Sequence, residues 1–224
     1  MSQGYEAGAA CPLPPGPIAA SSLRPDPDVV PGGLRAFFAQ NPRLALAYSG
    51  GTDSAFLLAC ALACGVDVRP YTVTSQFQFP FEGQDAEDAA AQLGVRPQVL
   101  RVDVMAACPA LADNPPERCY LCKGVLLRVV AEQAHEDGYA PLVDGTNASD
   151  DPSRRPGMRA LEEYCVRSPL REVGLTKDDV RALSRTMGLM TAGKPSYSCR
   201  ATHLPHGTRL TLEALESVQV EGWR

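Results

Sequence analysis

Strand-like runs alternate with helix-like runs along most of this chain, and this alternation constrains the fold more than any other feature. The strand-like runs lie at residues 44–49, 68–75, 97–104 and 140–147, and the helix-like runs at 53–64, 87–94, 119–138 and 176–188. Parallel strands need long crossover connections, which are usually helices. The sequence therefore predicts an α/β fold, with a mostly parallel twisted sheet and helices on both faces.

The first 33 residues differ from the rest of the chain in composition. Segments such as PLPPGP and RPDPDVVPGG are rich in proline and glycine and carry no sustained apolar period. Such a segment buries too little apolar surface to offset the entropy lost on ordering. We therefore expect a flexible leader at residues 1–33, followed by one folded domain at residues 34–208.

The net charge argues against a surface built for nucleic acid. The 224 residues carry a formal net charge of −5 at pH 7, whereas phosphate backbones are bound by basic patches. A small-molecule substrate is the better hypothesis. No apolar run reaches the roughly 20 residues that span a bilayer, and the N-terminus lacks the features of an export signal. We expect a cytoplasmic protein without membrane contact, whose eight cysteines are reduced.

A Ser-Gly-Gly-Thr-Asp-Ser turn at residues 49–54 connects the first predicted strand to the first helix. Two glycines before a helix allow backbone N–H groups to converge on an anion at the positive end of the helix dipole. The lysine of a Walker loop is absent, so a kinase or GTPase is not indicated. An Asp-Gly-Thr-Asn turn at 144–147 also follows a strand, so both turns are expected on one ligand-binding rim. An ordinary strand-to-helix turn explains the two glycines equally well.

The first turn resembles the SGGxDS loop of the N-type ATP pyrophosphatases, which activate a carboxylate or carbonyl as its adenylate and release pyrophosphate. The resemblance implies that ATP binds with Mg2+, and that its phosphates are held by Ser49, Gly50, Gly51, Thr52, Asp53 and Ser54. It also gives Asp53 a catalytic role, in orienting magnesium or a water. The alternative is structural, because an acidic residue in the first helical turn suits the helix dipole. The loop does not choose among amidating, nitrile-forming, tRNA-thiolating and sulfur-transferring members.

Five further motifs, in order, resemble the LarE family of ATP-dependent sacrificial sulfur transferases. They are NPPERCYLCKG at 114–124, DGTNASDD at 144–151, RPGMRAL at 155–161, VRSPLREVGLTKDDVRAL at 166–183 and KPSYSCRAT at 194–202. The resemblance covers about residues 35–215 and implies that residues 34–208 form an ATP pyrophosphatase (PP-loop) domain. It also implies a substrate, a carboxylated pyridinium mononucleotide. One of its carboxylates would become a thiocarboxylate in the biosynthesis of the nickel-pincer cofactor.

The same resemblance assigns binding residues. Gly145, Thr146 and Asn147 match the turn that lines the nucleotide pocket in the family. Arg155 and Arg167 match positions near the substrate site, and an arginine fork suits a phosphate or a carboxylate. For a single arginine taken alone, a solvated surface role is the default.

Three cysteines are candidates for the sulfur chemistry. Cys119 and Cys122 form a C-x-x-C pair at a helix start, which places two sulfurs close enough to share a metal. Cys199 lies between Lys194 and Arg200, whose charges favour the thiolate that attacks an activated carboxylate. The resemblance implies that Cys199 is either a sulfur donor, left as dehydroalanine, or the third ligand of an iron-sulfur cluster with Cys119 and Cys122. We favour a 4Fe-4S cluster; a zinc site and a redox dithiol are the alternatives.

The chain also departs from the family pattern. Arg200 stands where the family has a small or apolar residue, and His203 stands where it has arginine. Family members continue past the position of Arg224 with a small C-terminal domain that binds phosphate and helps to assemble an oligomer. We therefore expect residues 209–224 to start a truncated C-terminal segment, and a homo-oligomer is a hypothesis that the resemblance raises. A non-catalytic remnant that binds a nucleotide or a cluster is the alternative from another functional class.

Overall fold

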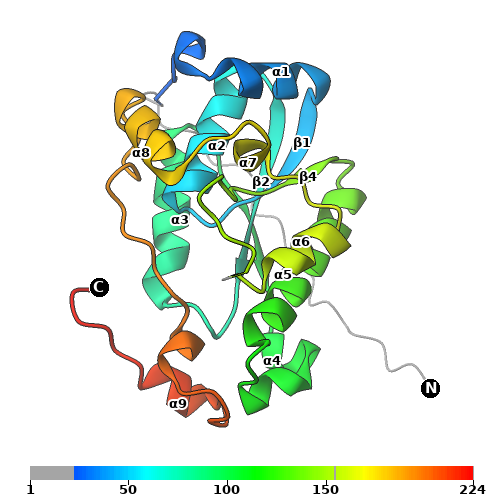
Figure 1. Cartoon of the computed structure of the whole chain (residues 1–224), viewed down its shortest axis with the longest axis vertical. Helices are drawn as coiled ribbons and strands as arrows, with labels where there is room; N and C mark the ends of the chain where they lie inside the picture. The colour runs from blue at the N-terminus through cyan, green and yellow to red at the C-terminus, as the bar shows by residue number, and fades with distance from the viewer. Residues whose placement is uncertain (1–22, 154, 224) are drawn as a thin grey trace.

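The computed structural model describes residues 23–153 and 155–223 (Figure 1). Residues 1–22 of the predicted leader lie outside the described residues. The remainder of the leader forms the short helix η1, Pro27–Val29, and the start of helix α1, Gly32–Gln40.

This end of the predicted leader belongs to the folded part of the chain. Val30 is 1% exposed and lies in the main apolar core. The backbone N–H of Leu23 donates to the carbonyl oxygen of Gln92 at 2.7 Å. The packed structure therefore begins before residue 34, because apolar residues between the prolines reach the core.

Four parallel strands form the sheet, in the order β3-β2-β1-β4. They are β1 (Arg43–Ala47), β2 (Asp67–Thr74), β3 (Gln98–Arg101) and β4 (Leu142–Val143). The predicted α/β class with a parallel sheet is thus confirmed. Pro70 is tolerated inside β2 because β3 pairs with β2 only from Tyr71 onward. The carbonyl of Tyr71 points to β1, where it accepts from the N–H of Tyr48, so Pro70 points to the unpaired edge.

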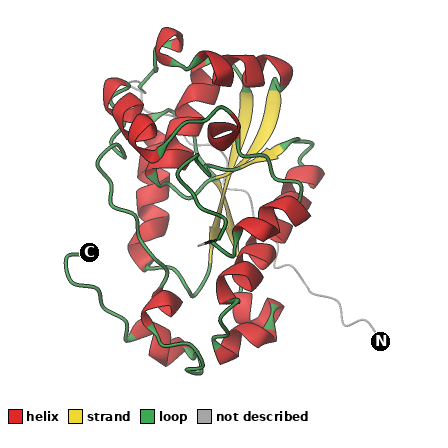
Figure 2. Ribbon diagram, in the orientation of Figure 1, coloured by secondary structure: helices red, strands yellow, loops and turns green. Residues whose placement is uncertain are grey.

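Helices cover both faces of the sheet (Figure 2). Side chains of β1 alternate between these two faces. Leu44 and Leu46 lie in one core cluster, under α1, α2, α3 and α8, whereas Ala45 lies in the other, under α5 and α6. The result is a three-layer α/β/α arrangement. The bounds of the covering helices are Thr52–Ala63 for α2, Pro80–Gln92 for α3, Arg118–Glu136 for α5, Met158–Glu163 for α6 and Lys177–Thr186 for α8.

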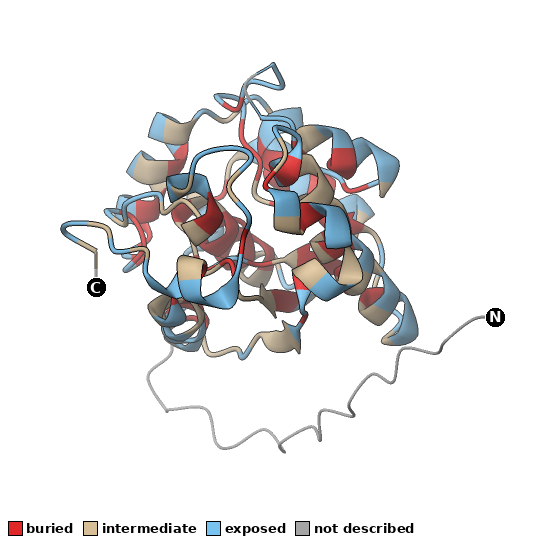
Figure 3. Ribbon diagram, turned by 90° about the horizontal axis from the view of Figure 1, so that it is seen from below, coloured by how far each residue is buried: buried red, intermediate tan, exposed pale blue. Residues whose placement is uncertain are grey.

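A third apolar cluster lies beyond the carboxyl ends of the strands, at the lower end of the molecule in Figure 1. Leu210 and Leu215 are buried in it, so the residues after 208 pack onto the domain. Seen from below, buried segments occupy the interior and exposed faces surround them (Figure 3). The cluster joins α5 to α4 (Val104–Ala107), the 3-10 helices η2 (Pro109–Asp113) and η3 (Arg200–His203), and α9 (Leu212–Glu216).

Capping side chains decide where two of the helices begin. The hydroxyl of Thr176 accepts from the N–H of Asp179 at 3.2 Å and the Asp179 carboxylate accepts from the N–H of Thr176 at 2.9 Å, as predicted for α8. Helix α3 begins at Pro80, earlier than the predicted residue 87, because Glu82 caps its start and accepts from the N–H of Phe79 at 2.8 Å. The sequence interpretation missed the short helices α1, α4, α6, α7 (Pro169–Glu172) and α9.

Within the two described ranges, no helix combines the length and the apolar character that crossing a membrane requires.

Candidate functional site

The two predicted turns lie at the point where the strand order reverses. The chain passes from β1 through α2 to β2 on one side of β1, and β4 lies on the other side. The carboxyl ends of β1 and β4 therefore form the topological switch point, where parallel α/β sheets bind ligands. The 49–54 loop follows β1 and the DGTN turn follows β4. This arrangement agrees with the prediction that both turns share one rim.

The path of the 49–54 loop requires its first glycine. Gly50 has a φ of +68°, and a Cβ at this position would lie 2.3 Å from the Cα of Ala86 on α3. The hydroxyl oxygens of Ser49 and Ser54 lie 3.1 Å apart, and the N–H of Gly51 donates to Ser49 Oγ at 3.3 Å. The last three residues of the loop, 52–54, form the start of α2, a helix of 12 residues. Its N–H groups therefore stand at the positive end of a helix dipole, which favours an anion.

The DGTN turn lies directly against the start of α2. A Cβ on Gly145 would lie 2.8 Å from the amide nitrogen of Ser54 and 3.1 Å from the carbonyl carbon of Asp53, so this approach requires a glycine. Asp144 is 7% exposed, and its carboxylate accepts from the N–H and the hydroxyl of Thr146, at 3.1 and 2.6 Å. These internal hydrogen bonds hold the turn in the shape that brings Gly145 to the loop.

Further polar contacts hold the DGTN turn. The hydroxyl of Ser168 donates to Asp144 at 2.7 Å, and the ammonium of Lys123 lies 3.4 Å from the same carboxylate. Asn147 is 2% exposed, and its side-chain oxygen accepts from the N–H of Ser149 at 2.9 Å. Asn147 therefore uses its side-chain oxygen within the turn itself.

Asp53 lies between the loop and α8. Its Oδ2 is 2.6 Å from Nζ of Lys177, the first residue of α8. Its Oδ1 is buried and has no hydrogen-bond partner within residues 23–153 and 155–223. A buried carboxylate oxygen without a partner is unfavourable, so this atom fits the magnesium ion that the sequence resemblance implies. Lys177 was not predicted as a site residue, although it stands at the start of a predicted helix.

The segment that follows α8 is tied to the same loop. Lys194 donates to the carbonyl oxygen of Gly50 at 3.1 Å and lies 3.0 Å from Asp85. The hydroxyl of Thr52 donates to the carbonyl oxygen of Thr191 at 2.8 Å. The KPSYSC motif is thus physically connected to the 49–54 loop, a contact that sequence spacing does not reveal.

The two arginines predicted for substrate binding are paired with carboxylates. Arg155 lies 2.9 Å from Asp150, and Arg167 forms an ion pair with Glu172 while its guanidinium carbon lies 4.6 Å from the ring centre of Phe37. The side chains of Arg155 and Arg167 are 64% and 43% exposed. Both guanidinium groups are therefore partly open to solvent, where a further anion can reach them.

The three cysteines predicted for sulfur chemistry lie in one neighbourhood, where α5 meets η3. Burial raises the pKa of Cys122 to about 12, and the thiols of Cys199, Cys119 and Cys108 act in the same direction. Cys119 is exposed, whereas the other three are partly buried. Nevertheless, no three His, Cys, Asp or Glu side chains within the described part of the chain are placed to hold a metal. The thiols are neighbours, but their present arrangement does not fit the predicted cluster.

The sulfur of Cys199 contacts a hydroxyl, and the two predicted cations form no hydrogen bond with it. Cys199 Sγ lies 3.2 Å from Thr202 Oγ1, which in turn accepts from the guanidinium of Arg118 at 3.3 Å. In the described ranges neither Lys194 nor Arg200 is a hydrogen-bond partner of this sulfur. The expectation that Lys194 supports a thiolate does not match its position, because its ammonium is held at the 49–54 loop.

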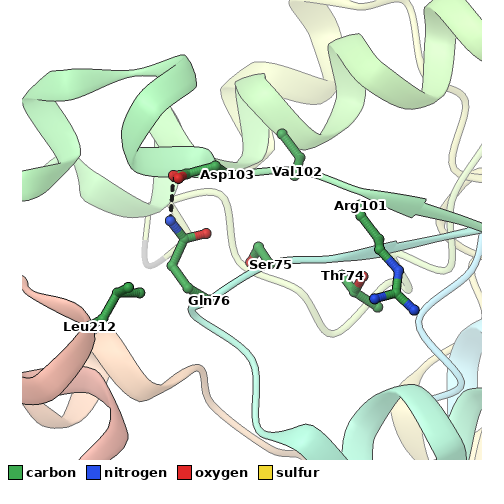
Figure 4. A pocket seen from close by; sticks show the side chains of 7 residues that line it. All are labelled: Thr74, Ser75, Gln76, Arg101, Val102, Asp103 and Leu212. Carbon is green, nitrogen blue, oxygen red and sulfur yellow. Dashed lines mark hydrogen bonds between the residues drawn. The ribbon is translucent and has the colours of Figure 1, made fainter. Parts of the chain in front are cut away.

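A hollow of about 350 Å³ lies at the carboxyl ends of β2 and β3 (Figure 4). The side-chain amide of Gln76 reaches across it and donates to the carboxylate of Asp103 at 2.5 Å. Leu212 of α9 and Arg101 of β3 lie on opposite sides of the hollow. The hollow is open to solvent, and none of its lining residues is a site residue expected from the sequence.

Comparisons with known proteins give relatives over most of the chain. No protein-family model matches it. The chain is 35% identical over 186 residues to an uncharacterised protein of Synechocystis sp., covering 83% of this chain and 69% of that protein. It is 32% identical over 178 residues to the pyridinium-3,5-bisthiocarboxylic acid mononucleotide synthase of Lactiplantibacillus plantarum, covering 79% and 64% of the two chains. The match thus spans about two thirds of the length of each relative.

Among solved structures, the chain is similar to the NMN synthetase from Francisella tularensis. The TM-score is 0.58 over 76% of this chain and 75% of that chain, and the sequences are 13% identical. At this identity the likeness shows a shared α/β fold.

Proposed function

The chain belongs to the LarE family, as its similarity to the Lactiplantibacillus plantarum synthase shows, and from this premise we propose that it is an ATP-dependent sulfur transferase. Its substrate would be a carboxylated pyridinium mononucleotide, and its product the corresponding thiocarboxylate. The proposal depends chiefly on one observation, the contact of Gly145 with the start of α2, where a Cβ would lie 2.8 Å from Ser54 N. This contact joins the two turns that the family motifs predict into a single site.

The first half of the proposed reaction is activation of the carboxylate. A carboxylate oxygen attacks the α-phosphorus of ATP, the bond from that phosphorus to the bridging oxygen breaks, and pyrophosphate leaves. The acyl-adenylate then carries AMP as a good leaving group. The N–H groups of the 49–54 loop and the α2 dipole would stabilise the negative charge on the phosphates. Ser49, Gly50, Gly51, Thr52 and Ser54 are the residues that we assign to this role.

Asp53 would hold a magnesium ion in this site. Its buried Oδ1 has no partner within the described ranges, and magnesium prefers carboxylate and phosphate oxygens. The ion would neutralise charge on the departing pyrophosphate. Lys177, 2.6 Å from the other oxygen of Asp53, would orient the carboxylate.

The second half of the reaction is sulfur delivery, which we assign to Cys199. Its thiolate adds to the acyl carbon and AMP leaves, which forms a thioester. Loss of the Cα proton of Cys199 and cleavage of its Cβ–S bond would then leave the sulfur on the substrate and dehydroalanine in the protein. The atoms and electrons balance without an added oxidant or reductant. The Thr202 hydroxyl, 3.2 Å from the sulfur, is placed to hold it by a hydrogen bond.

No step of this proposal runs through an iron-sulfur cluster. Cys119, Cys122 and Cys199 are neighbours, but the arrangement of their side chains does not fit a metal site. The predicted cluster is tested separately, by anaerobic reconstitution of the full chain with iron and sulfide. Cluster absorbance that disappears in Cys119→Ser would favour the cluster, and its absence in wild type would leave Cys199 as the sulfur source.

Arg155 and Arg167 are our candidates for binding substrate anions from the rim near the DGTN turn. Arg155 is attached to the turn through Asp150, whose carboxylate accepts from the N–H of Asn147 at 2.9 Å. The backbone of Arg167 pairs with β4, because its N–H donates to the carbonyl of Leu142 at 3.0 Å. Both guanidinium groups are exposed enough to leave their present partners for a phosphate or carboxylate.

Pyrophosphate release from ATP tests the proposed activation. Wild type should release pyrophosphate only when the carboxylated pyridinium mononucleotide is present. Asp53→Asn should lower this rate by about a hundredfold, the order expected when an electrostatic stabiliser is removed. Cys199→Ala should keep the activity, since adenylylation precedes sulfur transfer, and Cys165→Ala is a matched control at an exposed thiol. Release that does not depend on the carboxylated substrate would contradict the proposal.

A further inference from the structure

Arg200 lines a cavity of about 230 Å³ next to the cysteine of the proposed sulfur step. The cavity lies between the loop after β2 and the start of α3, where Ser75, Gln78 and Phe79 also line it. Arg200 reaches it as the first residue of η3, and Cys199 is the residue that caps this helix. A ligand in the cavity would therefore lie beside the segment that carries the reactive sulfur.

The guanidinium of Arg200 is positioned by an aromatic ring, and no described residue forms an ion pair with it. Its Cζ lies 5.3 Å from the ring centre of Phe79, and the backbone N–H of Arg200 donates to the carbonyl oxygen of Phe77 at 2.8 Å. Within residues 23–153 and 155–223, Nε of Arg200 is buried and has no hydrogen-bond partner. A buried N–H without an acceptor is unfavourable, so a ligand oxygen that accepts from Nε of Arg200 would stabilise this arrangement.

The charge of Glu82 interacts with Arg200, but Glu82 does not accept a hydrogen bond from the guanidinium. Burial raises the pKa of Glu82, while the positive charges of Lys194 and Arg200 lower it by less. One carboxylate oxygen of Glu82 already accepts from the N–H of Phe79 at 2.8 Å. In the described ranges no carboxylate lies within ion-pair distance of Arg200. The carboxylate of Glu82 therefore caps α3 and leaves the guanidinium of Arg200 to a ligand.

We propose that Arg200 and this cavity bind an anionic group of the substrate, either a carboxylate or the phosphate of a pyridinium mononucleotide. The inference rests on the proposed function and names the residue that selects its anionic substrate. A guanidinium binds two oxygens of either group through a planar fork, and the amide of Gln78 and the hydroxyl of Ser75 add polar groups to the cavity wall.

The single tryptophan of the chain can report on occupancy of this site. Trp223 makes an edge contact with Phe79, with ring centres 5.3 Å apart, and Phe79 carries the guanidinium of Arg200. An anion that draws Arg200 into a new hydrogen bond changes the surroundings of Phe79 and therefore the emission of Trp223.

The test is a binding titration of the full chain followed by Trp223 fluorescence and by calorimetry. Three probes separate the anions: nicotinate mononucleotide carries a carboxylate and a phosphate, nicotinamide mononucleotide carries only the phosphate, and nicotinate carries only the carboxylate. Arg200→Met should weaken binding of nicotinate mononucleotide at least about tenfold, because a charge-assisted hydrogen bond is lost. The affinity of Arg200→Lys should lie between those of wild type and Arg200→Met, since lysine keeps the charge but lacks the planar guanidinium. Arg128→Met, which removes an exposed arginine of α5, should bind as wild type does.

The probe whose affinity is insensitive to Arg200 identifies the group that this residue does not bind. Equal affinity of wild type and folded Arg200→Met for all three probes would overturn the inference. It would also be overturned if Arg200→Met raised the KM for ATP and left the KM for the pyridinium substrate unchanged. The proposed function fails on a different result, the absence of substrate-dependent pyrophosphate release in wild type. Arg200-dependent binding without that release would keep the anion site and reject the reaction.

Discussion

Replacement of Gly145 by alanine tests the contact that joins the DGTN turn to the 49–54 loop. The added Cβ would meet three backbone atoms, Ser54 N at 2.8 Å, Asp53 C at 3.1 Å and Ser54 Cα at 3.1 Å. Backbone atoms of a helix start cannot rotate away as a flexible side chain does. The turn or the loop must therefore shift, although alanine suits the backbone angles of this position, which has no positive φ.

Overpacking of this kind costs about 1–3 kcal/mol of the free energy of unfolding. The larger effect is expected on function, because a shift of the loop by a fraction of an ångström would misplace the N–H groups that we assign to phosphate binding. We expect kcat/KM for ATP in pyrophosphate release to fall by about tenfold to a hundredfold. Urea unfolding followed by circular dichroism measures the stability, and coupled pyrophosphate detection measures the activity.

Gly124→Ala is the matched control. A Cβ on Gly124 meets no atom within 4 Å, and this glycine lies inside α5, where alanine should stabilise the helix by about 0.5–1 kcal/mol. The two glycine-to-alanine changes should therefore have opposite signs. If Gly145→Ala unfolds at the same urea concentration as wild type and keeps its kcat/KM for ATP, the proposed contact between the turn and the loop is refuted.

Three further changes test other parts of the structure. Glu82→Gln should raise Tm at pH 7 but not at pH 4. Burial raises the pKa of Glu82, so the charged form of this residue destabilises the fold above that pKa. An equal gain in Tm at both pH values would contradict this. Iodoacetamide should modify exposed Cys119 well before Cys122, whose pKa is raised to about 12, as peptide mass mapping would show; equal rates would argue against the described burial. Thr176→Ala should cost about 1 kcal/mol in urea unfolding because it removes the N-cap of α8, whereas Thr186→Ala, at the exposed end of that helix, should cost less.

The sheet could be predicted from sequence because helix-like runs separate the strand-like runs, and such helices connect parallel strands. The Thr176 capping box and the apolar run of α2 fall within a residue or two of their predicted places. The start of helix α3 was predicted too late. Pro80 and Glu82 mark this start, but they lie among aromatic residues in a stretch that resembles a loop. Short helices such as α9 carry little periodicity of their own, and packing against the third apolar cluster determines them.

The candidate site could be predicted in its loops but not in its long-range pairs. The glycines and serines of residues 49–54 could be recognised from their type and spacing. Lys177 and Lys194, which reach Asp53 and Gly50, lie 124 and 144 residues from their partners, and no local pattern marks such contacts. The prediction of a metal site from cysteine spacing likewise depended on the orientation of the side chains, which spacing alone does not determine.

The most direct test of the central claim is mass spectrometry of the protein and the product after one turnover with ATP and the carboxylated pyridinium mononucleotide. The account predicts that one oxygen of the substrate carboxylate is replaced by sulfur and that Cys199 loses the elements of H2S to become dehydroalanine. Cys199→Ala should form AMP and pyrophosphate but no thiocarboxylate. A thiocarboxylate produced while Cys199 stays intact, or produced by the Cys199→Ala variant, would contradict the account.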